Sequence, residues 1–372
     1  MRIVRRAAIG AAALALVTGP VTAAAAGGGG DDDGDDAVPD VAGGLDGPRQ
    51  ISELDDDLLV VAESDSGEIS SVDVDSGEVQ TLVGGLVNPQ GVDARRDRLY
   101  IAVGESGPPE EGAPAPAEPP AVGQGGPGLL VTDLEGEVLH VVDTLEYELA
   151  ENPDGQVQFV DGAPVDALSN PFSVLVQRHR VLVADAGANA VLSVDRRSGE
   201  VGTFFVPPVI GPDEVPACAE APNNPGTVGC DPVPTGLARG PHGHVYVSTL
   251  GAEVPGAARV YELDPHGEEV GVIEDLTSAT GVAVDRRGTV YVSDLLEGAP
   301  EEEPGPDFDP TPVGEVVRIE PDGDRSTAQV TLPTGLLLED GDLYASAWSV
   351  AGFLGMPGRG EVVRVGEDVF TE

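Results

Sequence analysis

Hydrophobic residues along the chain form short runs separated by small, acidic and proline residues. The stretch "VLVADAGANAVLSVDRRSGEV", residues 181–201, shows the arrangement well. Runs of about 4–8 residues bounded by Asp, Gly and Pro are typical of β-strands joined by tight turns. Glycine (51 residues) and proline (33 residues) are abundant throughout, which fits a chain with many turns. The pattern therefore predicts an all-β fold.

The same succession of runs occurs six times. Each segment opens with a related phrase, continues with two more strand-like runs and, in the first five segments, ends with an acidic-glycine turn and a fourth run. Four antiparallel strands repeated six times predict a six-bladed β-propeller, in which each sheet covers the face of its neighbour. The opening phrases are GLDGPRQI, GLVNPQGV, ALSNPFSV, DPVPTGLA, LTSATGVAV and TLPTGLLL, which begin at residues 44, 85, 167, 231, 276 and 331.

The sixth segment lacks a fourth run after Val365. The stretch AVPDVAG, residues 37–43, precedes the first segment and has no strand partner of its own. We therefore expect this N-terminal segment to complete the last blade and close the ring, so that residues 37–372 form one propeller domain.

The long connections fall at equivalent places in the repeat. If the strands of each blade are lettered A to D from the axis to the rim, every long segment joins B to C or D to the next A. In a propeller these two connections leave on the same face, so we expect one loop-bearing face and one plain face. Function is expected on the loop-bearing face. The long segments are 104–128, 146–168, 207–232, 251–257, 297–314 and 349–360.

The N-terminus differs from the rest of the chain. Arg2, Arg5 and Arg6 precede an apolar run and then a small-residue stretch, which is the order of a secretory signal over residues 1–26. A Gly/Asp-rich linker follows at residues 27–36. We expect export to the cell envelope or beyond, with no transmembrane segment in the mature chain. The Arg5-Arg6 pair leaves both Sec and twin-arginine export open.

The chain is strongly acidic, with a formal net charge of −47 and 19 basic residues, all of them Arg. Such a surface repels nucleic acid and anionic lipid, so we expect no nucleic-acid partner. Two interpretations remain open: adaptation to a salty medium, and an acidic cation-binding surface. The acids are spread along the whole chain, which favours the first. It predicts loss of structure in dilute buffer and recovery in molar salt.

Cys218 and Cys230 are the only cysteines, and both lie in one proline-rich segment. In an exported protein two cysteines this close predict a local disulfide, although two free thiols are the alternative.

Several segments are similar to the ScyD/ScyE family of exported proteins, which in turn resemble NHL-type six-bladed propellers. The similarity lies in SNPFSVLV, VLVADAGANAVLSVD, VPTGLARGPHGHVYVSTLG and SATGVAVDRRGTVYVSDL. It covers roughly residues 44–365. The resemblance implies a six-bladed fold and export, and it implies no particular chemistry.

The first residues of the six A strands are expected at the mouth of the central channel on the loop-bearing face. One Arg and one Gln among Thr hydroxyls are suited to hold a carboxylate or sugar-like ligand, whereas a hydrated plug without ligand is the alternative. Trp348, the only Trp, begins the last long loop; it is either a ligand or partner anchor or a cover over the channel. The aligned residues are Arg49, Gln90, Phe172, Thr235, Thr280 and Thr334.

Acidic residues at the ends of B strands form a second candidate site near the same mouth. Glu63, Glu105, Asp185 and Asp294 offer carboxylates, and Asn88, Asn170 and Asn189 offer carbonyl oxygens, which are ligands for Ca²⁺ or another divalent cation. Gluconolactonase and regucalcin propellers hold a metal in such a place, but their ligand pattern does not map cleanly onto this chain. The alternative is that Glu63, Asp185 and Asp294 cap their own B–C turns through side-chain bonds to backbone N–H groups. No other cofactor is indicated.

These observations favour an exported propeller that acts as a binding scaffold for a small molecule or a protein. The alternative is a metal-dependent propeller hydrolase or lactonase, which is disfavoured because no His or Lys base is expected near the mouth. A surface-layer component is a third possibility. No catalytic residue is assigned.

Overall fold

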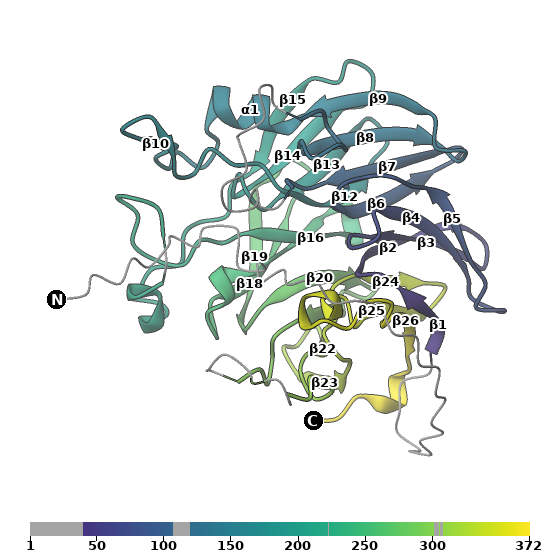
Figure 1. Cartoon of the computed structure of the whole chain (residues 1–372). Helices are drawn as coiled ribbons and strands as arrows, with labels where there is room; N and C mark the ends of the chain where they lie inside the picture. Colours follow the sequence, from purple (N-terminus) through teal and green to yellow (C-terminus); the bar gives the residue numbers. More distant parts are fainter. Residues whose placement is uncertain (1–39, 107–119, 222, 301–304, 306–307) are drawn as a thin grey trace.

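Six four-stranded antiparallel sheets surround one axis, so the predicted six-bladed β-propeller is confirmed (Figure 1). The computed structural model describes residues 40–106, 120–221, 223–300, 305 and 308–372. The predicted signal and linker, residues 1–36, lie outside the described residues.

Each blade uses three or four strands that follow one another along the chain. Blades 1 to 3 consist of β2 (Pro48–Asp55), β3 (Leu58–Glu63), β4 (Glu68–Asp73) and β5 (Val79–Val83); β6 (Pro89–Arg95), β7 (Arg98–Val103), β8 (Gly128–Asp133) and β9 (Val138–Asp143); and β12 (Pro171–Val176), β13 (Arg180–Asp185), β14 (Ala190–Asp195) and β15 (Val201–Phe205). Blades 4 to 6 consist of β16 (Pro234–Arg239), β17 (Val245–Thr249), β18 (Ala258–Leu263) and β19 (Glu269–Leu276); β20 (Ala279–Val284), β21 (Val290–Asp294), β22 (Glu315–Ile319) and β23 (Arg325–Gln329); and β24 (Leu336–Glu339), β25 (Asp342–Ala347), β26 (Gly360–Val365) and β1 (Asp40–Leu45).

The last blade is completed by the N-terminal strand, as the sequence predicts. β1 pairs antiparallel with β26 and becomes the outer strand of the sheet β1-β26-β25-β24. Leu45 of β1 is only 1% exposed, and it packs with Ile51 and Tyr344 at the junction of blades 6 and 1. The ring is thus closed by hydrogen bonds between the two ends of the folded chain.

The core lies between neighbouring blades. Residues of the second strands, such as Val61, Ile101 and Val183, are fully buried because both faces of each sheet are covered. Leu182 of blade 3, for example, packs in one cluster with Val247 of blade 4. Burial on both faces accounts for the continuous apolar runs of these strands in place of a strict alternation.

Blades 4 to 6 are joined near the axis by a repeated contact, which we call the threonine ring. Thr235, Thr280 and Thr334 each donate a side-chain hydrogen bond to a backbone carbonyl of the next blade, at 2.8 Å, 3.1 Å and 3.2 Å. The glycine after each Thr allows this approach. At Gly281, for instance, a Cβ would lie 2.1 Å from the backbone oxygen of Thr334. The Thr-Gly pair therefore recurs in these three blades because the Thr donates to the next blade and the Gly leaves room for its backbone.

Around blades 1 to 3, long side chains cross the channel instead. Gln50 of blade 1 reaches Val174 of blade 3 and makes two hydrogen bonds with its backbone, at 2.7 Å and 2.9 Å. Asp93 accepts from the amide of Val176 at 2.6 Å, and Arg239 donates to the carbonyl of Val176. The free edge of β12 is therefore satisfied by side chains. A gap of about 20 Å³ lies beside Gln50, and a second cavity of about 230 Å³ is lined by Gln50, Asp93 and Arg239.

The segment between blades 2 and 3 contains structure that the strand repeat does not predict. It forms α1 (Thr144–Glu151) and the hairpin β10 (Phe159–Val160) and β11 (Ala163–Pro164). Asp143 caps the helix by accepting from the amide of Glu146, and Asn152 ends it in a left-handed conformation. Figure 1 shows α1 and β10 at the left, away from the turns at the right ends of β4 and β5.

The remaining regular elements are single turns of 3₁₀ helix in loops. They are η1 (Pro216–Ala219), η2 (Pro241–Gly243), η3 (Gly251–Glu253), η4 (Ala351–Leu354) and η5 (Glu367–Val369). Within the described ranges no helix has the length and apolar character needed to cross a bilayer.

Candidate functional site

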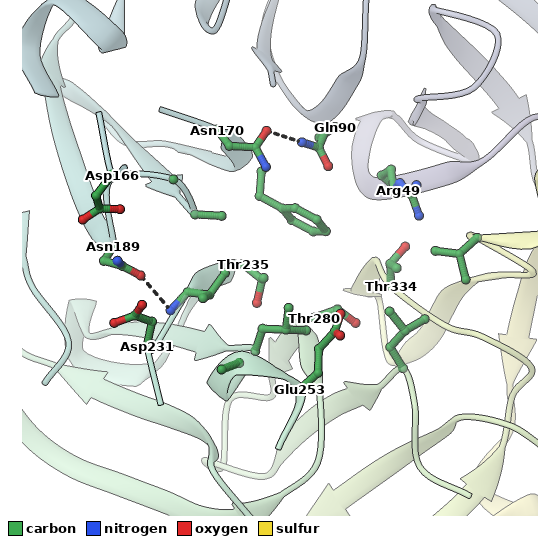
Figure 2. A pocket seen from close by; sticks show the side chains of 18 of the residues that line it. Arg49, Gln90, Asp166, Asn170, Asn189, Asp231, Thr235, Glu253, Thr280 and Thr334 are labelled. Carbon is green, nitrogen blue, oxygen red and sulfur yellow. Dashed lines mark hydrogen bonds between the residues drawn. The ribbon is translucent and has the colours of Figure 1, made fainter. Parts of the chain in front are cut away.

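The loop-bearing end of the channel contains a cavity of about 330 Å³, which we call the mouth cavity (Figure 2). Both D–A and B–C connections line it, which places these loops at one end of the channel. All six aligned A-strand residues contribute to its wall. They are Arg49, Gln90, Phe172, Thr235, Thr280 and Thr334.

Arg49 is the only basic residue among the described residues that line the mouth cavity, and it is only 4% exposed. Its Nε donates to Ser64 Oγ at 2.9 Å and its Nη1 donates to the carbonyl of Ser349 at 2.7 Å. Burial lowers the pKa of Arg49 and the nearby charge of Asp65 opposes this shift, but a guanidinium stays protonated in proteins. Two fixed nitrogens hold the group ready for an anionic partner.

Amide side chains and one aromatic ring lie beside Arg49. Gln90 donates from Nε2 to Asn170 Oδ1 at 2.8 Å, and the same oxygen accepts from the amide of Glu105 at 3.3 Å. Phe172 also lines the mouth cavity and supplies an apolar surface between the polar groups. This sector can therefore accept and donate hydrogen bonds around an apolar centre.

The three threonines take part in a different way from the one the sequence suggests. Their hydroxyl groups donate within the threonine ring, and each also lies near a serine of its own blade, as with Thr334 and Ser346 Oγ at 3.0 Å. Their hydroxyl hydrogens are therefore engaged by the fold. They shape the wall of the mouth cavity more than they supply free donors to it.

Trp348 does not line the mouth cavity. It is 7% exposed, belongs to the hydrophobic cluster of the last blades, and has Arg359 over its ring at 4.6 Å. From the same loop, Val350 lines the cavity instead. The structure thus places Trp348 in the core, where neither the anchor role nor the cover role applies.

The acids at the ends of the B strands act mainly as caps. Asp185 accepts from Ser169 Oγ and from the amide of Asn170, both at 2.6 Å. Asp294 accepts from the amide of Ser278 at 2.6 Å. Glu63 accepts from the amide of Asp46 at 2.8 Å and from the hydroxyl of Ser70. These amides precede the A strand of the same blade, so the acids mainly cap the D–A connection and not, as the alternative expects, their own B–C turns.

Asp185 is the exception, because it also accepts from the amide of Ala188 in its own B–C turn at 3.2 Å. Asn189 donates to Asp154 Oδ2 at 3.0 Å and accepts from the amide of Val233 at 3.3 Å. Asn88 donates to the backbone carbonyl of Glu105, whose side chain is exposed. Asn88, Glu105, Asn170 and Asp185 are thus linked to one another mainly through backbone groups. The described residues contain no group of three His, Cys, Asp or Glu side chains able to hold a metal.

Sequence reasoning singles out none of three carboxyl groups that line the mouth cavity. Asp166 comes from a D–A connection, Glu253 comes from the B–C connection of blade 4, and Asp231 is the first residue of the aligned phrase DPVPTGLA. The lengths of the connections and the place of Asp231 in that phrase are the signals that the sequence offers. Asp231 Oδ1 accepts from Gln156 at 2.8 Å, and Gln156 in turn accepts from Asn224 at 3.2 Å.

The environment of these carboxyl groups disfavours their charged forms. Burial, followed by the charges of Asp154 and Asp231, raises the pKa of Asp166 to about 7. Burial alone raises the pKa of Glu253 to about 7. Burial and then the charge of Asp154 raise the pKa of Asp231, which the hydrogen bond from Gln156 opposes. Perturbed acids in a cleft are typical of functional sites.

The predicted disulfide between Cys218 and Cys230 is confirmed, and it braces one wall of the mouth cavity. Both cysteines are fully buried, and Cys230 forms a two-way backbone bridge with Ile210. Asp231 follows Cys230 directly, and Asn224 lies inside the loop that the disulfide closes. The covalent link therefore restricts the positions of two lining residues.

The chain matches no known family profile, and no curated protein matches it in sequence. Solved structures nevertheless share its fold. A putative oxidoreductase (glucose dehydrogenase) from Thermus thermophilus has a TM-score of 0.53 at 15% identity, covering 88% of this chain and 99% of that one.

A gluconolactonase from Xanthomonas campestris has a TM-score of 0.52 at 11% identity, with 88% and 89% of the two chains covered. The PQQ-bound aldose sugar dehydrogenase from Streptomyces coelicolor has a TM-score of 0.51 at 13% identity, with 88% and 96% covered. At these identities the likeness concerns the fold, and the chain is similar to six-bladed propeller proteins whose chemistries differ.

Proposed function

We propose that the chain is an exported, acidic propeller of the ScyD/ScyE type that binds a small anionic molecule in the mouth cavity. The single observation that supports this most is Arg49: a buried guanidinium, fixed by Ser64 and Ser349, lines a cavity of about 330 Å³. Small-molecule sites occupy about 300–1,000 Å³, so the volume suits a ligand the size of a sugar acid.

Arg49 is a fixed positive charge in a strongly acidic protein. In a chain with a net charge of −47, anions are repelled at long range. A fixed cation inside a partly enclosed cavity is screened less than one at the surface, so it selects a carboxylate once the ligand has entered. Gln90 and Asn170 beside it suit hydroxyl groups of the same ligand.

The test is calorimetric titration with gluconate and glucuronate, using glucose as the neutral comparison. We expect the acids to bind about tenfold or more tightly than glucose, since a hydrogen bond to a charged group contributes about 1.5–3 kcal/mol. Arg49→Gln removes this preference, whereas Arg287→Gln, an exposed change in the turn between β20 and β21, preserves it.

A melt of each variant separates loss of binding from loss of fold. Equal binding of glucose and the acids by the unchanged protein contradicts the proposal, and so does a folded Arg49→Gln variant that keeps the preference.

A hydrolase or lactonase is the second candidate, and one observation favours it. Asp166 and Glu253 line the mouth cavity with pKa values of about 7, which suits proton transfer near neutral pH. Turnover of gluconolactone, measured with and without chelator, tests this candidate. Asp166→Asn and Glu253→Gln should abolish such turnover while the preference of Arg49 for acids remains.

A further inference from the structure

Arg49 and two of the carboxyl groups of the mouth cavity lie on opposite sides. Figure 2 shows Arg49 on one side of the cavity, Asp166 and Asp231 across from it, and Glu253 between them near Thr280. Arg49 belongs to blade 1, whereas the two aspartates lie in the connections that lead into blades 3 and 4. A single ligand that fills the cavity therefore meets a cation at one end and carboxyl groups at the other.

The acidic side lacks a compensating charge within the described wall. Asp166 and Asp231 are 6% and 7% exposed, and the basic lining residue is Arg49 on the other side. Gln156 donates to Asp231 and Asn189 donates to Asp154, but these side-chain amides carry no net charge. The raised pKa of Asp166 reflects this: burial comes first, and repulsion from Asp154 and Asp231 adds to it.

A second layer of acid lies behind this wall. Glu148 of α1 is 1% exposed; its Oε1 accepts from Gln158 at 2.9 Å, while its Oε2 is buried without a partner in the described structure. Burial, and then repulsion from Asp154, Asp185 and Asp166, raises the pKa of Glu148 to about 7. The fold thus concentrates negative potential at one end of the cavity and leaves part of it unsatisfied.

The wall of the mouth cavity also contains apolar side chains. Phe172, Leu250, Leu295 and Val350 line it together with Glu253 and the threonines, and none of these four offers a side-chain hydrogen bond. A ligand with a cationic end, an anionic end and an apolar body can use all three kinds of surface.

We infer that the ligand is a compact zwitterion, with a carboxylate on Arg49, a protonated amine at Asp166 and Asp231, and an apolar body between them. This inference rests on the proposed function, because it takes Arg49 as the anion-binding end. The amine supplies the positive charge that the acidic side lacks, and it favours the ionised forms of its carboxyl groups. Members of this class include ω-amino acids.

The experiment compares probes that differ only by the amine. γ-Aminobutyrate, δ-aminovalerate and ε-aminocaproate are titrated calorimetrically against butyrate, valerate and caproate at about pH 8, where the acidic side is largely ionised. Because the series spans several lengths, one member should fit the distance between the two ends. We expect at least one amino acid to bind roughly tenfold or more tightly than its parent acid.

Variants then test which residues cause the tighter binding of the amino acid. Asp166→Asn combined with Asp231→Asn should remove the advantage of the amine, so that each amino acid binds no more tightly than its parent acid. Asp161→Asn, an exposed change at the tip of the hairpin β10–β11, should have no effect. Melting curves confirm that the variants are folded.

The outcomes are distinguishable. If gluconate or the parent acids bind but no amine improves binding, the zwitterion is refuted while the anion-binding function stands. If the amine gain persists in the folded double variant, the inference is also wrong, because the amine then lies elsewhere. If none of these carboxylates binds, the proposed function fails and the inference fails with it.

Discussion

Blades 4 to 6 and blades 1 to 3 line the central channel with different kinds of side chain. In blades 4 to 6 the same pair, Thr then Gly, makes the same contact with the next blade three times. In blades 1 to 3 the equivalent first residues are Arg49, Gln90 and Phe172, and they do not repeat one another. The threonines of blades 4 to 6, the regular half of the ring, join neighbouring blades. Blades 1 to 3, the irregular half, supply the varied side chains that a ligand site requires.

The division is not complete, because the regular half also contributes loops. Glu253 comes from blade 4, and Asp231 precedes its first strand. The two halves differ in where their polar and charged lining residues come from. In blades 1 to 3, Arg49 and Gln90 lie on strands, and around blade 4, Asp231 and Glu253 lie in the connections between strands. Predictions that disturb either half should therefore have separable effects on stability and on binding.

The largest effect is expected where the two halves meet. Deleting residues 37–45 removes β1, exposes the edge of β26 and opens the cluster around Leu45. Losing a buried Leu side chain alone costs about 2–5 kcal/mol, and the pairing of the whole strand is lost in addition. We expect the melting temperature to fall sharply or cooperative unfolding to disappear. An unchanged melt would show that the ring does not depend on this closure.

A smaller effect separates the halves directly. Gly281 in blade 5 and Ser173 in blade 3 occupy equivalent positions, and both can be changed to Ala. At Gly281 the new Cβ meets the Thr334 backbone oxygen at 2.1 Å, so we expect a loss of about 1–3 kcal/mol or more.

Ser173→Ala keeps the Cβ and removes a buried hydroxyl that has no partner in the described structure, so it should be neutral or stabilising. Chemical denaturation measures both variants. Equal losses would mean that the two halves of the ring are equally restrictive at this position.

The smallest effect concerns the acidic side of the mouth cavity and depends on pH. The pKa of Asp166 is raised to about 7 in the folded chain, so the folded state holds this proton more tightly than the unfolded state. Its contribution favours folding fully below the ordinary pKa of 3.8 and is lost progressively as the pH rises from there to about 7. Asp166→Asn should therefore raise the melting temperature by a few degrees near pH 8 and by less near pH 5.

Asp161→Asn, which is exposed, is the control for this experiment and should show no such difference between the two pH values. A stabilisation of Asp166→Asn that is equal at both pH values would mean that ionisation is not its cause.

The sequence predicts the parts of this molecule that repeat. Blade number, closure by the N-terminal segment and the convergence of Arg49, Gln90 and Phe172 with the three threonines all follow from aligning the six phrases. The disulfide follows from the proximity of Cys218 and Cys230 in the chain. A repeat fixes equivalent positions in space, so alignment amounts to a coarse structural prediction.

The parts that do not repeat could not be placed in the same way. Asp166 and Glu253 lie in insertions, and nothing in their local sequence shows which way such a loop folds. The helix α1 has a local signal, since Asp143 and Glu146 form the start of a capped helix, but this segment lies outside the strand repeat. Trp348 differs in another way: its position at the start of a long loop suggested an anchor or a cover at the channel, whereas tertiary packing places it in the core of the last blades.

The bridge from Gln50 to Val174 has a further consequence. Beside that side chain the channel narrows to a gap of about 20 Å³, which lies between the mouth cavity and a second cavity of about 230 Å³ lined by Gln50, Asp93 and Arg239. Such a gap has room for about one water molecule, so a ligand the size of a sugar acid has to enter and leave through the loop-bearing end. Changes in the loops at that end should therefore alter both its association rate and its dissociation rate.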